Sequence, residues 1–291
     1  MSGRRSEAAH ADGIRQAGRM PGNELLDIAR TVAQEAGALA ARLRREGVEV
    51  AATKSSPIDI VTAADRESED LIRALIADAR PGDGFLGEES DATSSTTGLT
   101  WVVDPIDGTV NYLYDIPNYA VSIAVVEGDP DPHTWTALAA TVVNPAAGET
   151  FSAARGAGAT LNGTAIRANA EVDPSLALLG TGFAYNAERR VWQAGIVQHL
   201  IGQVRDIRRM GSAELDLCSV ACGRLDGYYE RGLNPWDHAA GALIAQEAGA
   251  RVEGLHGAAA SSDFTLATAP GLFAGIHELL LDAGAEASIL G

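Results

Sequence analysis

The clearest chemical signal in the sequence is residues 104–109, Asp-Pro-Ile-Asp-Gly-Thr, which directly follow the apolar run 101–103. Acidic side chains at the end of a buried strand are costly unless a cation or hydrogen bonds neutralise them. Pro105 fixes its own φ and favours an extended Asp104, so Asp104 and Asp107 can lie around one point without forming a helix. The segment therefore predicts a pair of carboxylates at a strand end.

Two further acids also lie at the expected ends of elements. Glu88 belongs to a Gly-Glu-Glu-Ser segment after an apolar pair, and Asp237 opens a helix after Pro-Trp. Gly108 permits close backbone approach, and a helix that begins near Thr109 would direct its free amides at a phosphate. Taken singly, Glu88 is better explained as a solvated loop edge and Asp237 as a helix cap. Together the acids suit Mg²⁺, a hard cation that takes oxygen ligands and often shares carboxylates with a substrate phosphate.

These segments resemble the successive motifs of the inositol monophosphatase family, in the family order. They are residues 54–65 (Lys-Ser-Ser-Pro-x-Asp-x-Val-Thr-x-x-Asp), 87–90 (Gly-Glu-Glu-Ser), 101–111 (Trp-Val-Val-Asp-Pro-Ile-Asp-Gly-Thr-Val-Asn) and 236–241 (Trp-Asp-x-Ala-x-Gly). The resemblance spans nearly everything after the N-terminal tail. It implies a layered α/β fold, the αβαβα sandwich of the sugar phosphatases, and a metal-dependent phosphomonoesterase that forms no covalent phosphoenzyme.

The resemblance also implies a site with two to three Mg²⁺ ions. Glu88, Asp104 and the backbone carbonyl of Ile106 would hold the first ion, and Asp104, Asp107 and Asp237 the second. A third ion would use Glu88 and waters. Paired ions can steady both the attacking and the departing oxygen of an in-line displacement.

Residues around this centre also take roles from the resemblance. Thr109, supported by Asp65, would orient and deprotonate the attacking water, while the amides of Gly108 and Thr109 grip the phosphate and Asp237 lies near the leaving oxygen. Asp65 fits a helix-capping box equally well, and it can do both jobs. Lys54 would lie in a loop that folds over the site; a solvated lysine is the alternative.

Substrate choice rests on a second group of residues. By resemblance, the inositol hydroxyls would be contacted by Ala213 in Gly-Ser-Ala-Glu-Leu-Asp, by Glu230 after Tyr-Tyr, and by Asp107 and Asp237. The leading substrate is inositol monophosphate. Fructose 1,6-bisphosphate, histidinol phosphate and adenosine 3′,5′-bisphosphate remain open because the metal motifs are nearly the same for all of them, and Glu230 also fits a surface acid.

Helices and strands must alternate to position these groups. Apolar spacing predicts a helix from the cap Asn23 to Gly47, and a capping box of Thr62 and Asp65 begins a second helix that stops at Pro81. Strands are expected at 101–103, 119–126, 135–143, 176–179 and around 228, with a hairpin turn at 162–163, and helices at 189–201, 212–222 and 239–248. We expect a mobile tail at 1–22 and two packed halves, 23–152 with most metal ligands and 153–291 with Asp237 and the substrate pocket.

Composition excludes several classes of protein. The formal net charge of −17 disfavours a nucleic-acid surface, and an acidic protein that binds a phosphate ester needs cations. The sequence shows neither a signal peptide nor a membrane span, and its two cysteines suit no disulfide framework, which favours the cytoplasm. A homodimer and lithium inhibition are expected from the resemblance alone.

Three other functions compete with the metal-dependent phosphatase. Cys218 to Arg224 fits the Cys-x5-Arg spacing of cysteine phosphatases, but its context is apolar and helical, whereas that chemistry needs a loop of inward-facing amides. Haloacid dehalogenase phosphatases use Asp-x-Asp, whereas two residues separate Asp104 from Asp107. The third is a scaffold or regulatory protein on the same fold.

Overall fold

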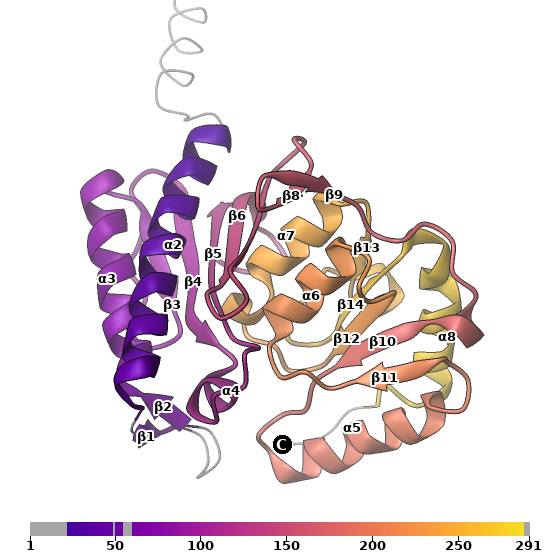
Figure 1. Ribbon diagram of the computed structural model, residues 1–291. Coiled ribbons are helices and arrows are strands. Elements are labelled where there is room, and N and C mark those ends of the chain that lie inside the picture. Colours follow the sequence, from indigo (N-terminus) through magenta and orange to yellow (C-terminus); the bar gives the residue numbers. More distant parts are fainter. Residues whose placement is uncertain (1–21, 49, 55–59, 288–291) are drawn as a thin grey trace, which may run out of the picture.

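The computed structural model describes residues 22–48, 50–54 and 60–287 and shows two β-sheets with helices outside and between them (Figure 1). Most of the predicted tail, residues 1–22, lies outside the described residues; only Gly22 is described, within the first helix. Among the described residues, no helix combines the length and the apolar character that crossing a membrane requires.

Two helices cover the outer face of the first sheet. Helix α2 (Gly22–Glu46) ends before Gly47, whose φ of +114° permits the reversal, as predicted. Because α2 already includes Gly22, Asn23 lies inside the helix, and its predicted role as the cap is wrong. Helix α3 (Ala63–Ala79) begins with the predicted capping box of Thr62 and Asp65.

The first sheet has seven strands in the order β3-β4-β5-β6-β7-β8-β9. Its strands are β3 (Gly84–Gly87), β4 (Leu99–Asp107), β5 (Ala120–Glu127), β6 (Thr136–Asn144), β7 (Glu149–Ala154), β8 (Ala159–Leu161) and β9 (Thr164–Ile166). A separate hairpin, β1 (Val50–Thr53) and β2 (Ile60–Thr62), precedes it. Strand β4 continues past Val103 to Asp107, with a register shift against β5 between Asp104 and Asp107, and short helix α4 (Thr109–Leu113) follows.

The second sheet has five strands in the order β11-β10-β12-β14-β13. The remaining elements are β10 (Leu178–Thr181), α5 (Ala187–Leu200), β11 (Asp206–Arg208), α6 (Ala213–Ala221), β12 (Gly227–Glu230), α7 (Ala239–Glu247), β13 (Arg251–Glu253), β14 (Thr265–Thr268) and α8 (Phe273–Asp282). Four 3₁₀ turns lie at Pro174–Leu176, Pro235–Asp237, Leu255–Gly257 and Pro270–Leu272. Residue 176, the predicted start of β10, therefore belongs to a turn instead.

The buried side chains divide into layers that match the predicted sandwich. One cluster joins α2 and α3 to the outer face of the seven-stranded sheet through Trp101 and Ile123, and another joins α6 and α7 to its inner face through Val102 and Leu243. A third cluster packs α5 and α8 on the far face of the five-stranded sheet. The order helix, sheet, helix, sheet, helix is visible in Figure 1.

The proposed division at residue 152 falls inside β7. The first sheet continues through β9 to Ile166, and the turn between β8 and β9 is the predicted one, at Asn162 and Gly163, both with positive φ. A division of the chain by sheets therefore falls between Ile166 and Leu178.

Candidate active site

A cavity of about 680 Å³ lies where residues of both sheets meet α4, α6 and the turn before α7. Most of the predicted site residues line it: Lys54, Glu88, Asp104, Ile106, Asp107, Gly108, Thr109, Ala213, Glu230 and Asp237. Asp65 is fully buried behind this wall and reaches it through Thr109. The predicted residues therefore come together.

The end of β4 presents its acids through an irregular strand. At the register shift, Asp104 Oδ1 accepts a hydrogen bond from the Ile106 amide at 3.0 Å, which fixes the side chain against its own backbone. Burial raises the pKa of Asp104 well above its usual value, and the charges of Glu88, Asp107 and Asp237 raise it further. This strand end is thus a place of concentrated negative potential.

Asp107 is fixed by the beginning of helix α6. Its Oδ2 accepts hydrogen bonds from Ser212 Oγ at 2.5 Å and from the Glu214 amide at 2.8 Å. Burial raises the pKa of Asp107 to about 6, although these donors oppose the rise. Ser212 also caps α6 by accepting from the Leu215 amide, so one hydroxyl serves both the helix and the site.

Glu88 lies beside an ammonium group from the β1–β2 hairpin. Lys54 Nζ is 2.7 Å from Glu88 Oε1 and 2.5 Å from Glu89 Oε1, with the lysine side chain 30% exposed. Burial alone would lower the pKa of Lys54, but the two carboxylates raise it above its ordinary value. Lys54 is therefore ion-paired with two acids at the site while its side chain stays partly exposed.

The loop that carries Glu88 is held from behind by helix α3. Glu69, which is 2% exposed, accepts hydrogen bonds through Oε2 from the Glu89 amide at 2.8 Å and through Oε1 from Ser90 Oγ. Gly87 is required here because a Cβ at this position would overlap the Glu69 carboxylate. The buried acid thus fixes the backbone directly after Glu88 and lies close against Gly87 before it.

Asp65 contacts both its helix cap and Thr109. Its Oδ2 accepts from the Thr62 amide at 2.8 Å and from Thr62 Oγ1 at 2.5 Å, while Oδ1 accepts from Thr109 Oγ1 at 3.2 Å. Burial is the main cause that raises the pKa of Asp65 to about 7. The structure therefore shows the capping role and the contact with Thr109 in the same side chain.

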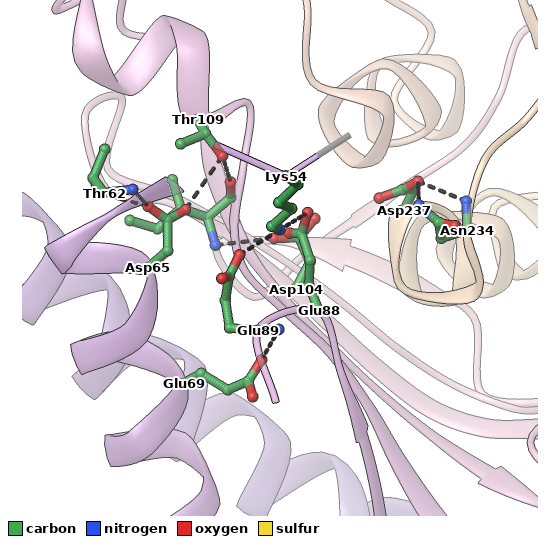
Figure 2. A network of polar contacts seen from close by, with 11 residues as sticks. Lys54, Thr62, Asp65, Glu69, Glu88, Glu89, Asp104, Thr109, Asn234 and Asp237 are labelled. Carbon is green, nitrogen blue, oxygen red and sulfur yellow. Dashed lines mark hydrogen bonds and ion pairs between the residues drawn. The ribbon is translucent and has the colours of Figure 1, made fainter. Parts of the chain in front are cut away.

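Asp237 approaches from the other half of the chain. It lies in the 3₁₀ turn before α7, and its Oδ2 accepts from the Asn234 amide at 2.6 Å and from Asn234 Nδ2 at 3.2 Å. Figure 2 shows Asp237 facing Glu88, Asp104 and Lys54 from the opposite side. Burial raises its pKa well above the usual value, and the charges of Glu88 and Asp107 contribute.

The opposite wall of the cavity carries Glu230 and Asp216. Burial raises the pKa of Glu230 to about 7, and Tyr228 donates a short hydrogen bond to its Oε2. Glycine is required at Gly182 because a Cβ there would occupy the place of the Glu230 carboxylate. Glu230 is therefore a built feature of the pocket wall, as the resemblance implies, and not a surface acid.

The cysteine-phosphatase interpretation fails on this structure. Cys218 is completely buried inside α6, and burial raises the pKa of its thiol well above the ordinary value. Arg224 lies outside the cavity in an ion pair with Glu149. An inert thiol and a distant arginine cannot carry that chemistry.

The acids fit a hard divalent cation by their chemistry. In the described ranges, no three His, Cys, Asp or Glu side chains already stand as a metal-binding group. Glu88, Asp104, Asp107 and Asp237 nevertheless offer only oxygen donors, and in each case burial and the neighbouring carboxylates raise the pKa. A cation among them would relieve this repulsion, and oxygen ligands are those that Mg²⁺ prefers.

Some contributors to the site were not predicted. Ser212, Glu69, Asp216 and Arg209, which also lines the cavity, were absent from the expected site. Ser212 had a usable signal, since a serine before an apolar helical run is a helix cap. Asp216 stands three residues after Ala213 on α6, and Glu69 four residues after Asp65 on α3, so helical spacing from a known site residue would have found both.

Comparison with known proteins agrees with this geometry. The model of the inositol monophosphatase family matches residues 22–287. An inositol-1-monophosphatase of Mycobacterium bovis is 46% identical over 253 residues, which cover 80% of this chain and 85% of that protein. A protein of Escherichia coli named Nus factor SuhB is 39% identical over 236 residues, covering 80% and 86%. The solved structure of Mycobacterium tuberculosis SuhB superposes with a TM-score of 0.77 at 40% identity, covering 92% of this chain and 99% of that one.

The family match extends over all the motifs that supply the cavity, and the structural match includes both sheets. On this evidence the chain belongs to the inositol monophosphatase family.

Proposed function

We propose that this protein is a Mg²⁺-dependent phosphomonoesterase that hydrolyses inositol monophosphate to inositol and phosphate. The observation that carries the proposal is the convergence of Glu88, Asp104, Asp107 and Asp237 on one cavity beside the Asp65–Thr109 hydrogen bond. The name of the Mycobacterium bovis relative, inositol-1-monophosphatase, supports the choice of substrate.

Each cation would be bound by a different set of the four acids. Glu88, Asp104 and the carbonyl of Ile106 would hold the first Mg²⁺ ion, Asp104, Asp107 and Asp237 the second, and Glu88 a third. When bound, the ions supply Lewis-acid stabilisation of the phosphate and a water of lowered pKa. The fixed carboxylate geometry is the protein's own contribution, because each acid is already oriented by a backbone amide or a neighbouring side chain.

Thr109 and Asp65 act on the attacking water. Thr109 Oγ1 lies 3.2 Å from both Asp65 Oδ1 and the Ile106 carbonyl oxygen, so its hydroxyl is held in one place. A water that donates to this hydroxyl is oriented toward the phosphorus, and its proton passes by way of Thr109 to Asp65, whose pKa of about 7 suits a general base. The amides of Gly108 and Thr109 would bind the phosphate oxygens, and Asp237 would lie near the leaving oxygen.

The substrate's hydroxyl groups would face Glu230, Ala213, Asp107 and Asp237. Because the pKa of Glu230 is about 7, this group can accept or donate a hydrogen bond near neutral pH. A polyol satisfies such a buried group, whereas an ester that lacks the hydroxyl leaves it unpaired.

The test is phosphate release from a panel of inositol 1-phosphate, fructose 1,6-bisphosphate, histidinol phosphate and adenosine 3′,5′-bisphosphate, with Mg²⁺ or with chelator. We expect Mg²⁺-dependent hydrolysis that favours inositol 1-phosphate and disappears in Asp104→Asn. Preference for another ester would keep the mechanism and overturn the substrate, and no hydrolysis by folded protein with Mg²⁺ would overturn both.

Several finer properties belong to the same proposal. We place the enzyme in the cytoplasm as a homodimer that lithium inhibits, and the net charge of −17 supports a protein that does not itself bind nucleic acid. Sedimentation of the purified protein tests the dimer, and titration of activity with Li⁺ at fixed Mg²⁺ tests the inhibition. A monomer, or activity indifferent to lithium, would contradict the respective point.

A second candidate is a regulatory role on the same fold. The name of the Escherichia coli relative, Nus factor SuhB, favours it. The two roles can be separated in a strain that lacks the gene and receives either the wild-type or the Asp104→Asn gene. If Asp104→Asn restores the wild-type phenotype fully, the function is non-catalytic. If it does not, the phenotype depends on phosphatase activity.

A further inference from the structure

Glu214 is a buried acid that none of the expected roles uses. It is the second residue of α6, its side chain is completely buried, and it lies between the two sheets. A buried carboxylate is costly unless hydrogen bonds compensate it, so its partners show what it does.

The side chain of Glu214 caps a different helix. Its Oε1 accepts from the Ala240 amide at 3.3 Å, and its Oε2 accepts from the Gly241 amide. These amides belong to the first turn of α7, whose own N-cap, His238, supplies no side-chain hydrogen bond. Glu214 therefore supplies from α6 the acceptors that α7 lacks.

The close approach of the two helices is specific to this contact. A Cβ on Gly241 would stand 2.6 Å from Glu214 Oε2 and 2.7 Å from Leu217 Cβ, so only glycine admits α6 this near. Ser122 Oγ of β5 donates to Glu214 Oε1 at 2.8 Å. One carboxylate thus joins α6, α7 and the seven-stranded sheet.

The backbone of Glu214 contacts the site directly. Its amide donates to Asp107 Oδ2 at 2.8 Å, while α7, which its side chain caps, begins two residues after Asp237. Asp107 and Asp237 come from different halves of the chain, and Glu214 contacts the first and the helix that directly follows the turn carrying the second.

We propose that Glu214 is a positioning residue that sets the placement of Asp237 relative to Asp107, and thereby the affinity of the site for a divalent cation. The inference rests on the proposed function, because it takes these two acids as ligands of one ion. Groups that orient metal ligands without touching the metal typically contribute about 10–100-fold to affinity.

Direct binding of Mn²⁺, followed by its EPR signal or by calorimetry without substrate, tests this proposal. We expect Glu214→Ala to weaken Mn²⁺ binding by about tenfold or more. Glu214→Gln should recover part of the loss, because its carbonyl can accept from the Gly241 amide while its NH₂, in the place of Oε1, donates to Ser122 Oγ and loses the contact with the Ala240 amide. Unchanged affinity in folded Glu214→Ala would overturn the proposal.

Glu247→Ala is the matched control. Glu247 is at the other end of α7, where its carboxylate accepts from the Gly156 and Gly158 amides at 2.8 and 2.9 Å, away from the cavity. Its loss should lower Tm and leave Mn²⁺ affinity within about twofold of wild type. An equal loss of affinity in Glu247→Ala would assign the effect to general destabilisation and overturn the proposal.

If Glu214→Ala does not fold, Glu214→Asp tests the positioning role of Glu214 instead. The shorter acid keeps the charge but cannot span to α7 from the same backbone, so weaker Mn²⁺ binding is expected and wild-type affinity would overturn the proposal. Failure of the proposed function looks different: wild-type protein would then bind no divalent cation.

Discussion

Asp65 and Glu69 stand one helical turn apart on α3, and they fix two neighbouring parts of the same side of the site (Figure 2). Asp65 accepts a hydrogen bond from Thr109, and Glu69 accepts one from the amide next to Glu88 (Figure 2). Because a helix keeps residues four apart at a nearly constant separation, α3 ties the group that we propose orients the water to the loop that carries a proposed metal ligand.

The Thr109 hydroxyl should be required for turnover. Thr109→Ala removes the group that Asp65 fixes, and we expect kcat to fall by about 10²–10⁴-fold with little change in KM. Thr109→Ser keeps the hydroxyl and should retain most of the activity. A Thr109→Ala enzyme with near wild-type kcat would contradict the assignment.

Lys54 should matter most to the metal-free protein. Without a cation, its ammonium is the positive charge beside Glu88 and Glu89, so Lys54→Ala should lower Tm in chelator. Saturating Mg²⁺ should reduce that difference, because it supplies positive charge to the same acids. Thermal unfolding of both proteins with and without Mg²⁺ checks this, and a Tm difference indifferent to Mg²⁺ would argue against it.

Stability should depend on pH in the metal-free protein. Folding raises the pKa of Asp107 to about 6 and of Asp65 to about 7, whereas an aspartate in an unfolded chain titrates near about 3.9. The folded state therefore binds more protons between these values, and the free energy of unfolding falls as pH rises from about 4 through about 7. In chelator, Tm should be higher near pH 5.5 than near pH 8, and Mg²⁺ should diminish the difference. A Tm that rises over this range in chelator would show that other groups dominate.

Asp104→Asn should abolish activity and stabilise the metal-free protein. Asp104 is 2% exposed and surrounded by other acids, so an uncharged side chain of the same shape should raise the free energy of unfolding in chelator at pH 8 by about 0.5–2 kcal/mol. Denaturant titration measures this, and the same protein should be inactive. If Asp104→Asn is less stable than wild type in chelator, the Asp104 carboxylate is stabilised by its contacts in the folded protein.

Glu230 should discriminate among substrates. Glu230→Gln alters the group that faces the substrate's hydroxyls, so KM for inositol 1-phosphate should rise by about tenfold. Hydrolysis of p-nitrophenyl phosphate, which has no hydroxyl groups, serves as the internal control and should change little. Equal losses on both esters would place Glu230 outside substrate recognition.

The sequence predicted the parts of this structure that depend on local signals. The capping box at Thr62, the strand that leads into Asp104, the turn at Asn162 and the helix after Ser212 all follow from residue types at fixed spacing. The four acids were also indicated by their positions at the ends of elements, whereas the sandwich and the role of each site residue were implied by resemblance to the family.

Features that depend on contacts distant in sequence were not predicted. Glu214 lies in an apolar helical context that indicates core packing, and nothing near it shows that its carboxylate caps α7. The commitment of Lys54 to Glu88 likewise joins residues from two separate segments. The first sheet continues past residue 152 because β8 pairs with β7 and β9 pairs with β8. Such pairing produces no change in composition along the chain that would mark where the sheet ends.

The long stretch of sequence between Asp237 and the acids of β4 has a consequence for how the chain folds. Asp104 and Asp107 can reach their strand end once the first sheet forms, but Asp237 joins them only after the turn before α7 has docked against β4 and β5. Contacts so distant along the chain form late, because closing long loops is entropically costly. During refolding, the helical circular dichroism signal should therefore recover before divalent-cation binding does. Recovery of cation binding then reports the last step of assembly. On the ribosome, the carboxylate set stays incomplete until the residues around 237 have emerged.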